Sequence, residues 1–230
     1  KDLVKQFVGQ VLNGTVRIGS DTEAMINARI AQIDSLISSQ LNEVMHHPDF
    51  QKLEGTWRGL KYLLGNTETG AQPTIKVMNV SKKDLLRDLQ KAPEFDQSAL
   101  FKKVYEEEFG VFGGTPFGAL LGDYEFGKSG QDIELLEKVS QLAAAAHAPF
   151  ITAASPDMMN MESFTQLDGT RDMTKIFDSP QYAKRKSIRQ REDSSYAGLC
   201  LPQIRIRLPY GKNSSSIDAF NSAGAVWRKV

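Results

Sequence analysis

The chain has 230 residues, of which 40% are hydrophobic, and this is enough to bury a core without disulfides. Its 28 basic and 28 acidic residues give a formal net charge of zero, which excludes a general electrostatic attraction to nucleic acid or to an anionic membrane. The single cysteine, Cys200, excludes an internal disulfide, and its apolar neighbours indicate a small buried residue rather than a reactive thiol.

A membrane-spanning segment is not expected. The most apolar run, Leu142 to Ala154, is too short to cross a bilayer and is interrupted by His147 and Pro149. The N-terminal residues lack the pattern of a secretory signal. We therefore expect a cytoplasmic protein that is not inserted into a membrane.

The first 65 residues predict helices. A short amphipathic helix at the start is broken by the segment NGTVRIGSD, which indicates an N-terminal arm over residues 1–20. The apolar residues of this arm are Val4, Phe7, Val8 and Val11.

Two longer helices follow the arm, each with apolar residues at steps of three and four. The first helix carries Ile26, Ile30, Ile33, Ile37, Leu41 and Val44. The second carries Phe50, Leu53, Trp57, Leu60 and Leu64, and it follows the break His46, His47 and Pro48. We expect these two helices to pack as a helical hairpin.

Strands and helices then alternate. Ile75, Val77 and the residues MNV indicate a strand, and Ser81 with Asp84 predicts a capped helix. Another helix begins at Ser98.

Further strands are predicted at about Phe117–Phe126 and Phe150–Ala154, separated by a helix from Asp132 to Ala148. This alternation predicts an α/β fold with a mainly parallel or mixed sheet flanked by helices. We expect the domain to span residues 21–210. Its last third should contain short helices and the edge strand Gln203–Leu208, and residues 211–230 should form an irregular tail.

The segment GDYEFGKS, Gly122 to Ser129, matches the phosphate-loop pattern. Such a loop needs small residues that turn between a strand and a helix and wrap phosphates with backbone N–H groups. Here Asp123 and Glu125 would bring negative charge, and Tyr124 and Phe126 would crowd the turn. Because ALLGDYEF continues a strand through the supposed loop, we predict no nucleotide cofactor here. A P-loop-type nucleotide-binding enzyme remains the alternative.

The glycines Gly110, Gly113 and Gly114 precede the strand, which is the wrong side for a dinucleotide site, and they indicate a tight turn with positive φ. The three histidines show no metal-ligand spacing, and no nucleophile motif is present. We therefore predict neither a metal site nor catalytic residues.

A basic run near residue 190 could grip phosphates. Its members are Lys184, Arg185, Lys186, Arg189 and Arg191. Because they are spread around the helix and are followed by Glu192 and Asp193, a solvated face or a protein–protein surface is favoured over nucleic acid. A nucleic-acid-binding module remains a third hypothesis.

Several ordered blocks resemble the large sheath subunit of the type VI secretion system, the TssC/VipB family. The most recognisable is HHPDFQKLEGTWRGLKYLL, His46 to Leu64. It is followed by VSKKDLLRDL, SALFKKVYEEEFGVFGGTPFGALLGDYEF, LAAAAHAPFITAASP, DSPQYAKRKSIRQREDSSYAGLCLP and RLPYG. The resemblance runs from about Asp21 to Tyr210. Members are longer, so the chain resembles their N-terminal part, and the residues after Phe220 do not continue the family pattern.

The resemblance implies a structural protein without catalytic residues. Family members pair with a small sheath subunit of the TssB/VipA type and stack helically around a tube of Hcp protein. The sheath is attached to a baseplate, and a ClpV-type AAA+ unfoldase recycles it after contraction. In this family ATP belongs to the unfoldase rather than to the sheath.

Partner-binding residues are predicted on the arm, on the long helix and in the basic run. These are Val4, Phe7, Val8, Val11, Ile26, Ile30, Ile33, Ile37, Arg189 and Arg191. A striped helix beside an arm offers apolar surface to a second chain. Trp57, in contrast, is interpreted as a core aromatic rather than an interface anchor.

Overall fold

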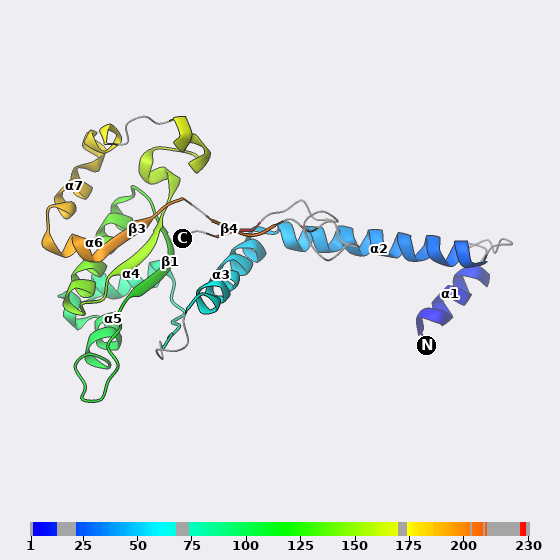
Figure 1. Cartoon of the computed structure of the whole chain (residues 1–230), viewed down its shortest axis with the longest axis horizontal. Coiled ribbons are helices and arrows are strands. Elements are labelled where there is room, and N and C mark those ends of the chain that lie inside the picture. The colour runs from blue at the N-terminus through cyan, green and yellow to red at the C-terminus, as the bar shows by residue number, and fades with distance from the viewer. Residues whose placement is uncertain are drawn as a thin grey trace. The chain divides into compact units, whose positions relative to one another are not determined.

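The computed structural model describes residues 2–12, 22–67, 74–169, 174–202, 204–208, 210 and 226–228 (Figure 1). The chain divides into two compact units. One consists of Lys1–Glu54 and Arg207–Val226, and the other of Gly55–Ile206 and Trp227–Val230. The expected boundaries of arm, domain and tail at residues 20 and 210 stay a prediction.

The first unit is built from helices. α1 spans Asp2–Leu12 and α2 spans Thr22–His46. The next helix, α3 (Pro48–Gly65), begins in this unit and continues into the second one. Pro48 suits the first turn of α3 because the N–H that proline lacks would have no partner within the helix there. All three helices agree with the sequence prediction.

The expected hairpin packing of α2 and α3 is not found over the described side chains of these helices. The six stripe residues of α2 are between 44 and 55% exposed. On α3, Phe50, Leu53, Trp57 and Leu64 are exposed as well. A hairpin would have buried both stripes against each other, so this part of the prediction is wrong. Periodicity showed that each helix has an apolar face, but it could not show what covers that face.

The second unit begins with capped helices. α4 spans Lys82–Lys91, and the Ser81 side chain accepts a hydrogen bond from the Asp84 N–H at 3.1 Å, as the sequence predicted. Ser98 caps α5 (Ala99–Phe101), which continues as the π-helix η3 (Lys102–Glu106). The short 3₁₀ helix η2 (Phe95–Gln97) precedes α5.

The strand predicted around Ile75 and Val77 is not formed. Residues 74–80 have no regular structure, and Val77 is 72% exposed. β-branched residues favour a strand only where a neighbouring strand and a packed face support it. Here β1 is an edge strand of the sheet, and residues 74–80 do not pair with it, so no neighbouring strand supports an extended segment there.

The sheet of the second unit has three parallel strands in the order β1-β2-β3. They span Leu120–Phe126, Phe150–Ala154 and Ala197–Cys200. α6 (Gly130–Ala145) connects β1 to β2. The predicted parallel sheet flanked by helices is confirmed, as are β2 and most of β1. The sequence analysis missed β3, which is only four residues long and contains Gly198. In it, Cys200 is half-buried rather than fully buried.

The core lies between one face of the sheet and the helices α4 and α6. Leu135, Val139 and Ala143 of α6 pack with Phe126 and Phe150 of the strands, and Leu89 of α4 joins them. A second cluster forms where Leu142 and Ala146 meet Phe101 and Val104. α6 ends at Ala145, and His147, two residues later, has a left-handed φ of 52°. The Ala148 N–H then donates to the Ala143 carbonyl at 3.0 Å.

The last third contains short helices and two strands. The longest helix is α7, which spans Ala183–Arg189. The others are the 3₁₀ helices η4 (Pro156–Met159), η5 (Phe164–Gly169), η6 (Lys175–Asp178), η7 (Pro180–Tyr182) and η8 (Glu192–Tyr196). β4 (Ile204–Arg207) is the predicted edge strand, and it forms a two-stranded sheet with β5 (Val226–Arg228). β5 lies in the stretch that we expected to be irregular, and residues 211–225 lie outside the described residues.

Leu142→Ala should lower the free energy of unfolding by about 2–5 kcal/mol, because Leu142 is fully buried and the substitution leaves a cavity. The matched control is Leu121→Ala in β1, where the side chain is 59% exposed. It should cost about 1 kcal/mol or less. Urea unfolding followed by circular dichroism measures both values, and equal losses would contradict this assignment of the core.

Candidate assembly surfaces

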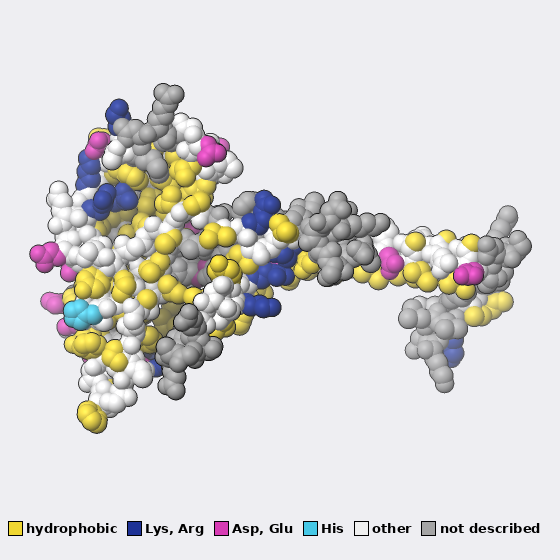
Figure 2. Space-filling model, in the orientation of Figure 1, with side chains coloured by type: hydrophobic (Ala, Val, Ile, Leu, Met, Phe, Trp, Pro, Cys, Tyr) yellow, Lys and Arg dark blue, Asp and Glu magenta, His cyan; other side chains and the backbone are white. Residues whose placement is uncertain are grey.

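The apolar stripe of α2 is a large exposed hydrophobic surface. Figure 2 shows hydrophobic side chains following this helix along its length. On the polar side of α2, the Arg29 guanidinium donates to Gln32 at 2.7 Å and to Gln10 of α1 at 3.0 Å. Long apolar stripes on isolated helices mark sites at which a second chain packs.

The structure places the predicted partner residues at different locations. Ile26, Ile30, Ile33 and Ile37 share the exposed stripe of α2, and Val8 of α1 is 48% exposed. The side chains of Val4, Phe7 and Val11 lie outside the described residues. Arg189 and Arg191 belong to the second unit and are exposed, and Arg191 forms an ion pair with Glu137 of α6. The roles of all these residues in partner binding stay a prediction.

Trp57 is exposed, not a core aromatic. Its side chain is 63% accessible, whereas Gly55 and Gly59 are the buried residues of α3. Residues 55 and 59 lie on one face of the helix, and residue 57 lies about 200° away on the other side. The physical reason for the error is that α3 packs through its small residues. The G-x-x-x-G spacing at Gly55 and Gly59 was the signal in the sequence that could have shown this.

The phosphate-loop match folds as a strand, as predicted. Gly122 to Phe126 belong to β1, and a Cβ at Gly122 would lie 2.5 Å from the Phe150 ring, so the glycine accommodates a neighbouring side chain. Asp123 accepts a hydrogen bond from Thr56 of α3 at 2.5 Å. The Tyr124 hydroxyl donates to the Val80 carbonyl at 2.8 Å. Gly122, Asp123 and Tyr124 therefore contact neighbouring parts of the protein, as residues of a strand do.

Carboxylates occupy the start of α6, where a phosphate loop would hold its ligand. The Gly127 N–H donates to Asp132 at 2.7 Å, and the same carboxylate pairs with Lys82 at 2.6 Å. Lys128 lies 3.1 Å from Asp157 and donates to the Asn160 side chain at 2.8 Å. The lysine and the loop N–H that would bind phosphate are therefore satisfied by protein groups.

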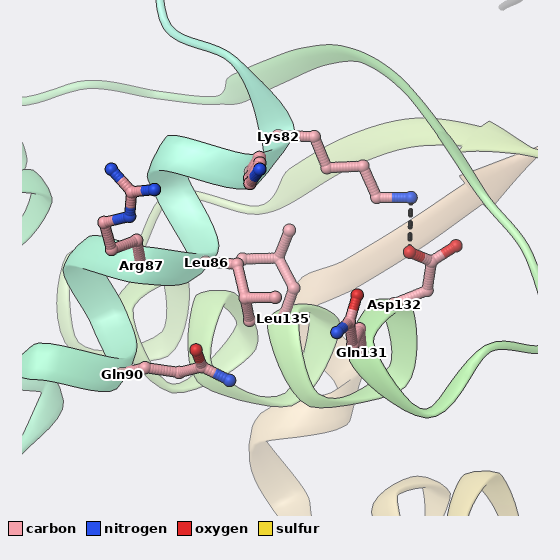
Figure 3. Close-up of a pocket in the computed structure, with 8 residues that line it drawn as sticks. Lys82, Leu86, Arg87, Gln90, Gln131, Asp132 and Leu135 are labelled. Atoms are coloured by element: carbon pink, nitrogen blue, oxygen red, sulfur yellow. Dashed lines mark ion pairs between the residues drawn. The ribbon is translucent and has the colours of Figure 1, made fainter.

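A cleft of about 430 Å³ lies between α4 and the N-terminal part of α6 (Figure 3). Leu86 and Leu135 form its apolar floor, and the polar residues lie around them. The lining residues are Lys82, Lys83, Leu86, Arg87, Gln90, Gln131, Asp132 and Leu135. The charges around the apolar floor are largely balanced, because Lys82 pairs with Asp132, Arg87 lies 3.9 Å from Asp84, and Gln90 donates to Glu134 at 3.1 Å. The sequence analysis did not find the cleft, because its two halves are about 45 residues apart in the chain.

A loop after the π-helix exposes three apolar side chains. Phe109 and Val111 are 43 and 55% exposed, and Phe112 is fully exposed. Gly113 has a φ of 84°, which confirms the predicted turn at that position. Gly110 and Gly114 do not have positive φ, but a Cβ at Gly114 would lie 2.2 Å from the Glu108 carbonyl oxygen. The loop therefore has a defined shape that requires glycine.

Glu108 fixes the base of this loop. Its carboxylate forms an ion pair with Lys76 and accepts a hydrogen bond from the Thr115 hydroxyl at 3.1 Å. The hydrogen bond from Lys76 lowers the pKa of Glu108 below its ordinary value. Stacked rings lead from the loop into the body, since Phe109 stacks on Tyr105 and Tyr105 stacks on Phe101.

A buried ion pair joins residues far apart in the sequence of the first unit. Arg207 of β4 donates to Glu54 of α3 from Nε at 2.8 Å and from Nη2 at 3.4 Å. The two side chains are only 7 and 10% exposed. Arg207 also lies over the Tyr210 ring at 4.6 Å. The two hydrogen bonds fix the orientation of β4 relative to the first part of α3.

Within the described ranges, no group of three or more His, Cys, Asp or Glu side chains is placed to hold a metal ion. Among the helices that the structure describes, none has the length and apolar character needed to cross a membrane.

The chain matches the family model of VipB, described as EvpB/VC_A0108, tail sheath N-terminal domain, over residues 27–226. The chain belongs to the VipB family of tail sheath proteins. It is also similar to the type VI secretion system sheath protein TssC1 of Pseudomonas aeruginosa. The two are 47% identical over 219 residues, which are 94% of this chain and 44% of that protein.

The chain thus spans less than half the length of this sheath relative. The family match continues to residue 226, so the expectation that the resemblance stops after Phe220 is wrong for the next six residues. For a sheath protein, the surfaces that matter are those that contact other chains. The α2 stripe, Trp57, the cleft and the Phe112 loop are the candidates.

Glu54→Ala should lower the free energy of unfolding by about 3–5 kcal/mol, because it leaves the buried Arg207 charge without its partner. The double variant Glu54→Leu, Arg207→Met should cost less than the single one, since it removes both charges. Thermal and urea unfolding provide the values. If the double variant is less stable than Glu54→Ala, the prediction is wrong, because the loss would then come from removing the ion pair and not from leaving one buried charge unpaired.

The Glu108–Lys76 pair should give stability a defined pH dependence. Because the folded-state pKa of Glu108 is lowered, the stabilisation is complete above the ordinary pKa of glutamate and is lost as the pH falls through the lowered value. The difference in unfolding free energy between the unmodified chain and Glu108→Gln should therefore be constant at neutral pH and shrink in acid. A difference that grows below pH of about 4 would contradict the assignment.

Proposed function

We propose that the chain is part of a structural, non-enzymatic subunit of the contractile sheath of a type VI secretion system. The membership of the sheath family carries this proposal, and the exposed stripe of α2 supports it. The subunit pairs with a small sheath subunit, and the pairs stack with further copies around an Hcp tube in the cytoplasm. Contraction of this assembly drives effector delivery, a baseplate anchors it, and a ClpV-type unfoldase disassembles it.

The stripe of α2 is the proposed contact with the small subunit. Its six aliphatic side chains are about half exposed, so covering them is worth on the order of 1 kcal/mol each. The continuous stripe extends over most of a 25-residue helix, which suits packing against a helix of a partner. Val8 and the other apolar residues of the arm would extend the same contact.

The alternative function, a P-loop-type nucleotide-binding enzyme, is disfavoured by the geometry of the matching segment. Asp132 accepts the N–H of Gly127, and Lys128 is paired with Asp157. A triphosphate would have to displace these contacts and approach two carboxylates, which costs electrostatic energy. ATP in this system would then be used by the unfoldase.

The test is coexpression with a small sheath subunit of the TssB/VipA type. We expect the unmodified chain to copurify with it, and the longer sheath protein that contains this chain to form tubules visible by negative-stain microscopy. The double variant Ile30→Asp, Ile37→Asp should abolish copurification, because two charges in the stripe cannot be desolvated.

The matched control is Ser35→Asp, Ser39→Asp, which adds the same charges on the opposite face of α2. This control should copurify like the unmodified chain, and circular dichroism should show that both double variants are folded. Undiminished copurification of the isoleucine variant would remove the proposed role of the stripe.

A further inference from the structure

One face of the three-stranded sheet is only partly covered. Leu120 and Phe150 pack in the core beside α4 and α6. Because successive side chains of a strand point to opposite faces, Leu121 and Ile151 belong to the other face. These two residues are in register on neighbouring strands and are 59 and 36% exposed. The next position in this row, on β3, is Gly198, which adds no side chain.

The uncovered area has a definite boundary. Ala153 lies two residues after Ile151 on the same face and is only 5% exposed. Asp123 of β1 accepts a hydrogen bond from Thr56 of α3. Gly198 is exposed, and a Cβ placed there would lie 3.9 Å from Cγ1 of Ile151, so no side chain shields Ile151 from the β3 side. The face is therefore open at the N-terminal ends of the strands and closed further along.

An open apolar area is unusual on a parallel sheet. Parallel sheets are almost always covered on both faces, whereas antiparallel sheets commonly leave one face in water. In this sheet β1, β2 and β3 are all parallel, and α4 and α6 cover the face that carries Phe126 and Phe150. Leu121 and Ile151 therefore need a covering element that the described residues do not supply.

The small size of the open area selects the kind of partner. Leu121 and Ile151 together expose on the order of 200 Å², whereas each side of a stable complex between separate proteins contributes about 800 Å². A second domain of the same chain needs less contact area, because tethering gives it an effective concentration in the millimolar range. The matching family model is that of an N-terminal domain, and the shared region is 44% of TssC1, so more than half of that sheath protein lies outside it.

We propose that a helix from the part of the longer sheath protein that follows this chain packs on Leu121 and Ile151. The helix presents an apolar face to the sheet, as α4 and α6 do on the other side, and it completes a layer of helices on each face. The contact forms within one subunit and does not require assembly. This proposal rests on the proposed function, because the covering helix belongs to a sheath protein as long as TssC1.

The test compares the thiol reactivity of Leu121→Cys in two proteins, this chain of 230 residues and the longer sheath protein that contains it, both with Cys200→Ser. Labelling with a maleimide is followed by mass spectrometry of the peptide that carries residue 121. We expect labelling to be about tenfold slower, or more, in the longer protein, because the thiol reacts only when the covering helix is displaced. The matched control is Val77→Cys, a 72% exposed aliphatic position of the same unit, which should react at similar rates in both proteins.

A cross-link identifies the covering element. The photoreactive residue p-benzoylphenylalanine, placed at position 121 of the longer protein, should cross-link to a peptide that follows this chain in sequence. A mixture of unlabelled and isotope-labelled protein should give only cross-links between peptides of the same isotope, because the contact is within one chain. Both readouts also apply to the complex that copurifies with the small subunit.

Equal labelling of Leu121→Cys in the short and the long protein would overturn the inference, and so would equal protection of residues 77 and 121. Cross-links from position 121 to the small subunit or to a second copy would overturn it too. The α2 copurification test is independent of this face of the sheet. If copurification fails while residue 121 is protected and cross-linked as expected, the proposed role of the α2 stripe is wrong and the sheet contact stands; the opposite outcome refutes only the sheet contact.

Discussion

The packing of α6 against the parallel strands is the constraint on which the second unit depends. α6 connects β1 to β2, and parallel neighbours require such a crossover because a tight turn cannot join them. Its apolar face buries Leu135, Val139 and Ala143 against Phe126 and Phe150. Its first turn fixes the end of β1, since Asp132 binds the Gly127 N–H and Lys82 of α4.

This arrangement explains why a phosphate-loop pattern need not bind phosphate. In a nucleotide site, the loop between strand and helix leaves its N–H groups free for the ligand. Here a carboxylate of the same helix takes the N–H of Gly127, and the lysine of the pattern is held by Asp157 and Asn160. The residues that satisfy the loop come from α6 and from η4, which the pattern itself does not include.

The surfaces left uncovered differ in kind, and each suits a different contact. α2 presents a continuous aliphatic stripe, whereas the loop after the π-helix exposes Phe109, Val111 and Phe112. On the exposed face of the sheet, Leu121 and Ile151 are in register with Gly198. Several separate contacts per subunit can each be weak while an assembly of many subunits is stable as a whole.

The sequence by itself determined the helices, β2, most of β1 and the cap at Ser81, because these depend on local periodicity and on hydrogen bonds within a few residues. It also indicated the family, through ordered blocks that span most of the chain. Tertiary structure alone decided which apolar faces are covered. Trp57 is exposed because the buried face of α3 carries Gly55 and Gly59, and residues 74–80 form no strand because they do not pair with the edge strand β1. The cleft likewise exists only because folding brings Lys83 and Arg87 to Gln131 and Leu135, and side chains so far apart in the chain share no local pattern.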